Sequence, residues 1–284
     1  MTYVTIFNNK YHIILQALDL NNIQLTGLPV DICNLFNLKT LELAHNQLSS
    51  LPSAIGNLIN LQFLSLSNNK LSSLPPTIGN LINLQTVDLS YNQLSCLPSA
   101  IGNLINLQSL SLSNNKLSSL PATIGNLIKL QDLYLTNNKL SSLPAEICNL
   151  INLQYLDLSN NKLTSLPIAI GKLVNLKYCD LHNNKLSTLP TAISKLFNLQ
   201  YLILFKNKLT SLPTEILNII YIIDINETSY EINNLDINCP ILIFSNLNID
   251  IGNLPINIKE IWLSSKIKKF NIKLPFGCKI NKYW

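Results

Sequence analysis

Arginine is absent from this sequence, and charge of either sign is sparse. All 20 basic residues are lysines. Charged residues make up 12% of the 284 residues, and the formal net charge is +5. Bidentate recognition of guanine and phosphate depends on the guanidinium group, so the composition argues against a nucleic-acid reader with sequence specificity.

Long apolar runs are also missing. The longest run, Ile216 to Ile225, is interrupted by Asn218 and Asp224. It falls short of the roughly 18 apolar residues that a membrane-spanning helix needs. The first residues carry no basic leader before a long apolar stretch, which argues against a secretory signal. We therefore expect a protein without a transmembrane segment.

The residues that usually carry catalysis are few and scattered. His12, His45 and His182 are too far apart in repeat register for a metal cluster, and the glycines are singletons rather than a phosphate-binding loop. The six cysteines are dispersed instead of grouped into terminal caps, which favours a reducing cytoplasm: Cys33, Cys96, Cys148, Cys179, Cys239 and Cys278. Three of them, Cys33, Cys148 and Cys179, replace framework leucine or glycine and are expected to be small buried thiols. The sequence thus predicts a cytoplasmic protein that is not an enzyme and has no metal or cofactor.

One 23-residue unit fills most of the chain. It recurs nine times without a gap from Leu15 to Tyr221, and LQYLDLSNNKLTSLPIAIGKLVN (Leu153 to Asn175) is a typical copy. A fixed period of this kind indicates a solenoid, in which each unit buries its apolar side only against its neighbours. We therefore expect one elongated domain without a central core.

Each copy predicts a short strand and then a turn. Leu156 and Leu158 alternate with Asp157 and Ser159, so the leucines are expected to point inward and the polar side chains outward. An asparagine follows each strand, where its amide could satisfy backbone groups of its own coil and of the adjacent coil. These asparagines are Asn46, Asn69, Asn92, Asn115, Asn138, Asn161, Asn184 and Asn207.

A Leu-Pro pair begins the return segment of each copy. Pro167 is expected to start a turn of helix, with Ile170, Leu173 and Val174 on one buried face. Strings such as LPAEI also resemble the opening of an F-box, but they fall in register with the repeat. We therefore interpret them as part of it.

The leucine spacing, the asparagine and the LP-x-x-I segment resemble the leucine-rich repeat, and more narrowly its intracellular 23-residue subclass of Ras-group and Scribble-like proteins. The resemblance implies an α/β repeat solenoid: a leucine-rich-repeat horseshoe with a parallel concave sheet and with short helices or 3-10 turns on the convex side. It also implies a scaffold or adaptor that binds a protein, such as a small GTPase or its regulator. The family has no short motif for that interaction, so no residue is carried over.

Both ends of a solenoid must be capped. We expect an N-terminal cap at residues 1–14, nine leucine-rich repeats at residues 15–221, and degenerate β-rich C-terminal repeats or a cap at residues 222–284. The stretch from Leu254 to Ile280 resembles FNIP-type repeats and the repeat proteins of amoeba-infecting giant viruses.

Outward-facing strand positions in the C-terminal half carry aromatic side chains. Since parallel strands lie about 4.8 Å apart, these side chains are expected to form one patch on the concave face. Exposed aromatic clusters anchor protein interfaces; the alternatives are that neighbouring tyrosines cover each other or that the C-terminal cap covers the patch. The predicted partner-binding residues are Tyr134, Tyr155, Tyr178, Tyr201, His182, Ile203, Phe205, Asp132, Asp157 and Asp180.

Acidic residues run beside the aromatic column. Asp157 and Asp180 are direct neighbours across two strands, where like charges are unfavourable. A basic segment of a partner would relieve that repulsion, and the alternative is that both carboxylates are simply solvated. An open strand surface offers neither the desolvation nor the convergent ligands that acid–base catalysis or a divalent cation would need.

In consecutive repeats a lysine directly follows the turn asparagine, and these lysines form one flank of the solenoid. Such a row solubilises an edge and discourages sideways aggregation. The alternative is a salt-sensitive anion site for nucleic acid or anionic lipid, blind to sequence. The flank consists of Lys116, Lys139, Lys162, Lys185 and Lys208.

The sequence therefore predicts a non-enzymatic interaction scaffold that binds a protein on its concave face. Anion binding along the lysine flank is the alternative from a different class. A purely structural spacer is a third possibility, since recently duplicated repeats would add length without adding a binding site.

Overall fold

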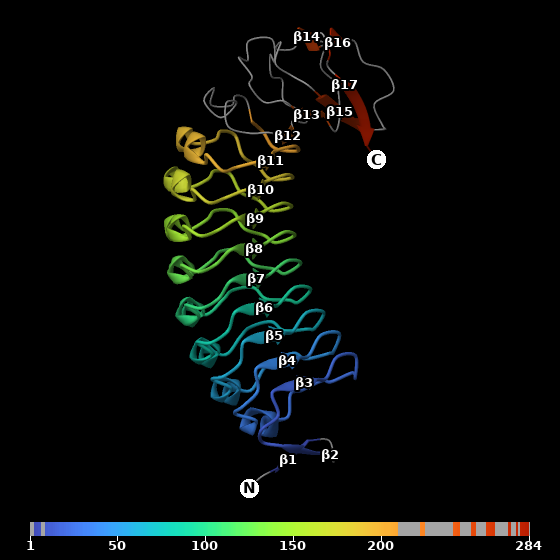
Figure 1. Cartoon of the computed structure of the whole chain (residues 1–284), viewed down its shortest axis with the longest axis vertical. Helices are drawn as coiled ribbons and strands as arrows, with labels where there is room; N and C mark the ends of the chain where they lie inside the picture. Colours follow the sequence, from blue (N-terminus) through green and yellow to red (C-terminus); the bar gives the residue numbers. More distant parts are fainter. Residues whose placement is uncertain are drawn as a thin grey trace. The chain divides into compact units, whose positions relative to one another are not determined.

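The structure is a computed structural model that describes residues 3–6, 9–209, 222–224, 241–244, 251–253, 260–264, 272–273, 277 and 279–283. The chain forms two compact units. The first comprises Met1–Leu140 with Pro144–Leu153, and the second comprises Ser141–Leu143 with Gln154–Trp284. Each unit has the predicted α/β architecture, with short parallel strands on one side and 3-10 helices on the other (Figure 1).

The first unit opens with an antiparallel hairpin of β1 (Tyr3–Ile6) and β2 (Asn9–His12). Parallel strands then pair with a step of 23 residues, as Leu64 beside Val87 illustrates. The predicted sequence period is therefore the structural period. The strands are β3 (Ala17–Asp19), β4 (Thr40–Glu42), β5 (Phe63–Ser65), β6 (Thr86–Asp88), β7 (Ser109–Ser111) and β8 (Asp132–Tyr134).

The second unit keeps the same step through its first three strands and then extends its parallel sheet with shorter steps. The step is 21 residues from Tyr201 to Ile222, and it is 19 residues between the register partners of each later pair of strands, as from Ile222 to Ile241. That sheet contains β9 (Tyr155–Asp157), β10 (Tyr178–Asp180), β11 (Tyr201–Ile203), β12 (Ile222–Asp224), β13 (Ile241–Phe244), β15 (Glu260–Ser264) and β17 (Lys279–Tyr283). A separate parallel pair joins β14 (Ile251–Asn253) to β16 (Ile272–Lys273). The predicted repeat boundary at Tyr221 lies outside the described residues, as do Cys239 and Cys278, and the three-part division of the chain stays a prediction.

A five-residue 3-10 helix follows a proline in each complete described repeat. Proline presets the backbone for a helix start, and the first helical positions need no backbone donor. No helix among the described residues is long and apolar enough to cross a bilayer. The 3-10 helices are η1 (Val30–Asn34), η2 (Ser53–Asn57), η3 (Pro76–Asn80), η4 (Ser99–Asn103), η5 (Ala122–Asn126), η6 (Ala145–Asn149), η7 (Ile168–Lys172) and η8 (Thr191–Lys195).

The predicted buried helix face is wrong at one position. Ile170 and Leu173 are buried, but Val174 is 44% exposed. The helix ends at Lys172, and Leu173 already has φ −76° and ψ 55°, outside helical geometry. The i+4 spacing therefore does not apply to Val174. An exposed apolar residue recurs at the same place in other repeats, for example Ile82 and Ile105.

The strand leucines and the turn asparagines behave as predicted. Leu156 and Leu158 are fully buried. Asn115 is 8% exposed; its Oδ1 accepts a hydrogen bond from the backbone N–H of Leu94 at 2.9 Å, and its Nδ2 donates to the carbonyls of Leu89 at 2.9 Å and Leu112 at 3.0 Å. One side chain thus satisfies polar groups of two successive coils, which are buried away from water.

Ser159 departs from its predicted outward exposure. It is 2% exposed, and its hydroxyl donates to Asp157 Oδ1 at 2.6 Å. A small side chain that folds back on its neighbour is covered by the larger side chains around it. The strand alternation therefore gives the direction of Ser159 but not its burial.

Burial is confirmed for the three cysteines predicted to be buried. Cys33, Cys148 and Cys179 are buried and Cys96 is exposed, and all four are free. Burial, with a further contribution from the charge of Asp31, raises the pKa of Cys33 to about 11. Burial also raises the pKa of Cys179 well above its usual range. These thiols are packing residues, because only the thiolate is reactive.

Each turn after a strand places one residue in the left-handed region of backbone space. Asn68 has φ 54° and Asn114 has φ 57°, and asparagine tolerates this conformation. Tyr91 occupies the same position with φ 53° and is 56% exposed. A bulky side chain there is strained, since its Cβ approaches the following carbonyl.

Replacing Tyr91 with asparagine is expected to raise the free energy of unfolding by about 0.5–1 kcal/mol, because asparagine relieves that strain. Urea denaturation of the two proteins measures the difference. Tyr91→Phe is the matched control, which keeps the bulk and the strain and should leave stability unchanged. A Tyr91→Asn protein no more stable than the parent would show that the tyrosine makes compensating contacts.

Candidate functional site

Three tyrosines form a continuous row on the strand face of the second unit. Parallel pairing of β9, β10 and β11 places Tyr155, Tyr178 and Tyr201 side by side in register. The rings of Tyr155 and Tyr178 stack with centroids 4.3 Å apart at 3°, and those of Tyr178 and Tyr201 lie 6.0 Å apart at 41°. The tyrosines do cover each other in part, as the alternative interpretation holds, yet Tyr201 remains 41% exposed and the other two are half-buried.

Two carboxylates lie in the next column of the same strands. Asp157 and Asp180 are register neighbours. Asp157 Oδ1 accepts from the Ser159 backbone N–H at 2.9 Å and from its hydroxyl, while Asp180 Oδ1 accepts from the backbone N–H of His182 at 2.9 Å and from its Nδ1 at 2.8 Å. Asp180 is 7% exposed, so the interpretation of both residues as simply solvated is wrong for Asp180.

The imidazole of His182 connects side chains at one end of this face. His182 stacks on Phe205 with centroids 4.5 Å apart at 9°. Asn183 Nδ2 donates to Asn160 Oδ1 at 2.7 Å, so the amide nitrogen of Asn160 is the atom that meets His182 Nε2, at 3.1 Å. In a neutral imidazole, Nε2 would therefore accept from this amide, and Nδ1–H would donate to the Asp180 carboxylate.

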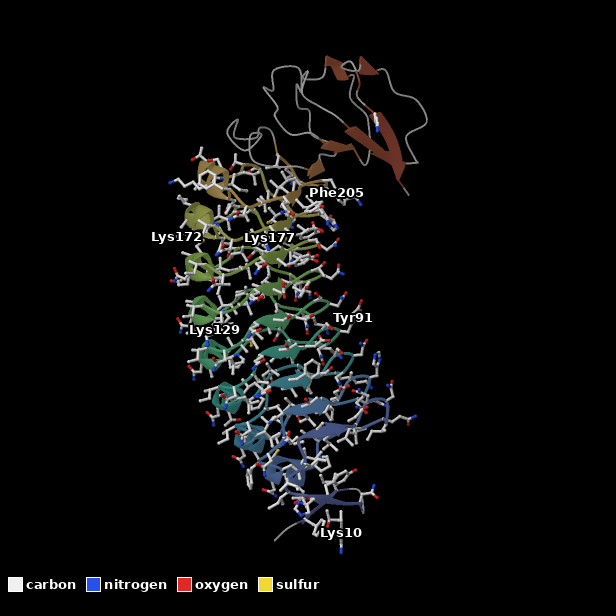
Figure 2. All side chains as sticks on the ribbon, viewed as in Figure 1. Lys10, Tyr91, Lys129, Lys172, Lys177 and Phe205 are labelled. Carbon is white, nitrogen blue, oxygen red and sulfur yellow. The ribbon has the colours of Figure 1, made fainter. Side chains whose placement is uncertain are left out.

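We call this surface the tyrosine face. Figure 2 shows its Phe205 on the strand side of the second unit and Lys172 on the helix side. Ile203 is half-buried beside Asp180 in register. The tyrosine face consists of Tyr155, Tyr178, Tyr201, Asp157, Asp180, His182, Ile203 and Phe205.

Two predicted members belong to the first unit. Tyr134 and Asp132 are half-buried on β8, where they pair in register with Ser111 and Ser109 of β7. Burial raises the pKa of Asp132. In the 23-residue repeat, Tyr134 is equivalent to Asp157, and Asp132 is equivalent to Tyr155.

Burial makes the charge of Asp157 costly. Desolvation raises the pKa of Asp157 above that of an ordinary carboxyl group, and the charge of Asp180 raises it further, whereas the hydrogen bonds from Ser159 and the proximity of His182 lower it. Burial and the charge of Asp180 likewise raise the pKa of the Tyr178 hydroxyl. The face therefore carries negative charge that the fold itself leaves incompletely compensated.

Replacing Asp157 with asparagine is expected to raise the free energy of unfolding at pH 7 by about 0.5 kcal/mol, because it removes a like-charge pair and keeps an acceptor for Ser159. A carboxyl group whose pKa is higher in the folded protein favours folding below its unfolded pKa and loses that contribution as pH rises through the folded pKa. The gain should therefore vanish at acid pH, where Asp157 is neutral.

Denaturation at several pH values measures this effect. Asp88→Asn is the matched control: Asp88 accepts from the backbone N–H of Ser90 at 2.9 Å but has serines as its register neighbours, Ser65 and Ser111. It should show no comparable gain. Equal effects at both positions would mean that the Asp157–Asp180 repulsion is negligible.

The predicted lysine flank is exposed. In the second unit, consecutive coils align the main chains of Lys162, Lys185 and Lys208, with the Lys185 N–H bonded to Leu163 O and the Lys208 N–H bonded to Leu186 O, both at 2.8 Å. In the first unit Lys116 Nζ donates to Gln93 Oε1 at 3.0 Å. Within the described part of the chain, none of these ammonium groups pairs with a carboxylate.

Catalytic arrangements are not found among the described residues. No group of three or more His, Cys, Asp or Glu side chains is placed there to hold a metal ion. A shallow groove of about 230 Å³ in the first unit contains carboxamides and one ammonium group but no nucleophile or general base; it is lined by Gln62, Asn83, Gln85, Asn106, Gln108 and Lys129.

Sequence reasoning missed the network around His182. The signal was present in the D-x-H spacing of Asp180 and His182, because a carboxylate commonly accepts from the backbone two residues on. Asn160 and Asn183 complete the network.

Family comparison identifies the repeat. A model described as a leucine-rich repeat region matches residues 53–145 and 137–236, and a second described as a leucine-rich repeat matches residues 37–58. No curated protein sequence matches the chain.

Solved structures similar to this chain include proteins of bacteria and of a plant. A leucine-rich repeat protein of Leptospira interrogans is 31% identical with a TM-score of 0.62, and the match covers 88% of this chain and 66% of that one. The ectodomain of the membrane receptor kinase GASSHO1/SCHENGEN3 of Arabidopsis thaliana, solved with CASPARIAN STRIP INTEGRITY FACTOR 2, is 26% identical with a TM-score of 0.69; the match covers 88% of this chain but 36% of the ectodomain.

An internalin of Listeria monocytogenes shares the fold, with 20% identity, a TM-score of 0.71, and coverage of 91% of this chain and 84% of the internalin. The chain thus spans about two thirds or less of the first two of these proteins.

Proposed function

Because the chain belongs to the leucine-rich repeat family, whose domains generally mediate protein–protein interaction, we propose that it is a scaffold or adaptor that binds a protein partner on the tyrosine face. The observation that carries the proposal is the row of Tyr155, Tyr178 and Tyr201, which remains partly exposed on a strand surface held by backbone hydrogen bonds. Rigid aromatic anchors contribute much of the binding energy of protein interfaces.

The rigidity of the face supports this proposal. Tyrosine has few rotatable bonds, and stacking between Tyr155 and Tyr178 restricts them further. A partner therefore finds the anchors already in place and loses little conformational entropy on binding them. Ile203 and Phe205 add apolar area on the next strand.

The carboxylates give the face a preferred partner charge. Asp157 and Asp180 supply negative potential beside the aromatic row, which would speed association with a basic segment and orient it. On the first unit, Asp132 and Tyr134 stay proposed partner-binding residues.

Several finer assignments follow from family resemblance. A cytoplasmic location, a role in signal transduction, membership of the intracellular 23-residue subclass, and a small GTPase or its regulator as partner are proposals; the uniform 23-residue register supports the subclass. The plant receptor ectodomain, solved with a bound protein factor, illustrates that this fold presents binding surfaces. The proposed resemblance to FNIP-type repeats concerns a stretch largely outside the described residues.

Affinity capture tests the proposal. The native chain and a Tyr155→Ser, Tyr178→Ser, Tyr201→Ser variant are compared as baits in eukaryotic cell lysate, with mass spectrometry as the readout. The control bait replaces Ile82, Ile105 and Ile128 with serine; these are 49%, 52% and 54% exposed and follow the 3-10 helices instead of the strands. A protein retained by the native and control baits and lost by the tyrosine variant is expected, and identical captures by all three folded baits would contradict the proposal.

A second candidate function is anion binding along the lysine flank. The observation that favours it is that Lys162, Lys185 and Lys208 are exposed in consecutive coils without a carboxylate partner among the described residues. Binding to single-stranded DNA or to anionic vesicles should then weaken steeply with salt and should fall on Lys→Gln changes at these positions. If neither the tyrosine variant nor the lysine variant changes any binding, the chain acts as a spacer.

A further inference from the structure

We propose that the tyrosine face takes an arginine of its partner, with the guanidinium group lying across the carboxylates of Asp157 and Asp180 and beside the ring of Tyr178. The inference rests on the proposed function, since it names the side chain that this face recognises. The proposed partner is a polypeptide segment that carries an arginine with an apolar residue next to it.

Each carboxylate has one oxygen in use and one available. The Oδ1 atoms of Asp157 and Asp180 each accept two hydrogen bonds from the residue two positions on. Within the described part of the chain, Asp157 Oδ2 has no hydrogen-bond partner, and Asp180 Oδ2 meets only the Tyr178 hydroxyl, at the long distance of 3.5 Å. The bonds at Oδ1 fix the orientation of the two side chains, so a guanidinium group would bond to their Oδ2 atoms.

The spacing of the two carboxylates suits a planar cation with several donors. Neighbouring parallel strands lie about 4.8 Å apart, and Asp157 and Asp180 are register partners. A guanidinium group presents five N–H donors in a fixed plane and can donate to both carboxylates at once. The ammonium group of lysine is a compact and strongly hydrated point charge. Its desolvation would therefore cost more free energy, and its hydrogen bonds would be less directional.

No cation of the chain itself neutralises this pair among the described residues. The ion pair recorded there is His182 with Asp180, and it is one only when the imidazole is protonated. Lys206 lies nearby, but its ammonium group sits 5.9 Å from the centre of the Phe205 ring. The Asp180 side chain is 10% exposed, and burial raises the pKa of Asp157. Both carboxylates are therefore already partly desolvated, and attraction to an incoming cation would offset that cost.

The aromatic side of the face favours the same cation. The half-buried rings of Tyr155 and Tyr178 border the carboxylates on the same strands. Guanidinium groups stack on aromatic rings and are weakly hydrated, so a site that combines carboxylates with tyrosine rings discriminates for arginine. The neighbouring strand changes character: it carries Ile203 where its neighbours carry aspartates, and Phe205 follows it. An apolar residue beside the arginine would contact that strand.

Selection from a random phage-displayed peptide library tests the assignment. The full chain is the target, and parallel selections use Asp157→Asn, the triple tyrosine-to-serine variant, and Asp88→Asn as a control from the same column in the first unit. Asp157→Asn can keep an acceptor for Ser159, removes the charge, and replaces the second carboxylate oxygen with an amide nitrogen. The native chain and the Asp88→Asn control are expected to enrich peptides with arginine beside an apolar residue, and Asp157→Asn is expected to lose the arginine preference.

Synthetic peptides then measure the chemistry. A selected peptide is compared with its Arg→Lys and Arg→citrulline forms by isothermal titration calorimetry. Loss of the charge-assisted hydrogen bonds should weaken binding about 10- to 100-fold for citrulline, with a smaller but clear loss for lysine. On Asp157→Asn the three peptides should differ much less.

The outcomes separate this inference from the proposed function. If the tyrosine variant enriches the same peptides as the native chain, the tyrosine face is not the binding surface and both proposals fail. Peptides that depend on the tyrosines but lack arginine, or bind equally well with lysine, overturn the arginine assignment alone. A native chain that enriches no peptide also overturns that assignment, and the capture experiment then decides the proposed function.

Discussion

Replacing Asn115 with leucine is expected to lower the free energy of unfolding of the first unit by about 3 kcal/mol, which is a large fraction of the stability of a typical domain. The asparagine is 8% exposed and bonds to backbone groups of two coils. Leucine has a similar size but no polar atoms, so it leaves the Leu94 N–H buried without its partner. It also removes one of the two hydrogen bonds to the Leu89 carbonyl, the other of which comes from Asn92 Nδ2 at 3.1 Å. A buried polar group left without its partner costs about 1–3 kcal/mol.

Urea denaturation followed by circular dichroism measures this loss. Gln108→Leu is the control, because Gln108 is exposed, its side chain makes no hydrogen bond to the described part of the chain, and the same apolar residue is introduced. A change within about 0.5 kcal/mol is expected. The account would be contradicted by an Asn115→Leu protein as stable as the parent, because its buried backbone groups would then have found other partners.

The second large effect concerns binding. Replacing Tyr178 with serine is expected to weaken the affinity for the captured partner at least about 30-fold, which corresponds to the 2 kcal/mol typical of an interface hot spot. Tyr178 is the central ring of the row, 4.3 Å from Tyr155 and 6.0 Å from Tyr201. Its removal takes away one anchor and also frees the two flanking rings to adopt other rotamers.

Two further variants make this result interpretable. Tyr178→Phe keeps the ring and should retain most of the affinity if stacking and apolar contact dominate. Phe197→Ser removes a residue of the second unit that is 72% exposed on the far side of the repeat, and it should leave the affinity unchanged. A thermal melt of each variant separates lost contact from lost structure, because the stacking itself contributes about 1 kcal/mol to stability. Equal affinities for Tyr178→Ser and the parent would remove the row from the interface.

The fold could be predicted because its determinants are local and repeated. Alternation of Leu156 and Leu158 with polar residues gives the strand, Asn115 and its equivalents close the turn, and Pro167 starts the helix. Since parallel strands pair with a step equal to the 23-residue period, columns of the sequence become columns of the sheet. The tyrosine row followed from that step alone.

What could not be predicted depends on packing between side chains. The exposure of Val174 reflects where a 3-10 helix ends, which the sequence pattern does not reveal. Asp180 is buried because His182 folds over its carboxylate and in turn stacks on Phe205. No repeat period encodes the stacking of His182 on Phe205, since it joins unlike residues of different coils. The strained turn at Tyr91 is invisible for a similar reason, because the backbone conformation is imposed by the neighbouring coils.

Site-specific photo-crosslinking tests the central claim most directly. A benzophenone amino acid is placed at position 201, on the tyrosine face, or at position 197, which follows the 3-10 helix in the same repeat. Each labelled chain is irradiated with the captured partner. The account predicts a covalent adduct from position 201 and none from position 197. An adduct from position 197 alone would place the partner on the helix side and contradict the tyrosine face as the binding surface.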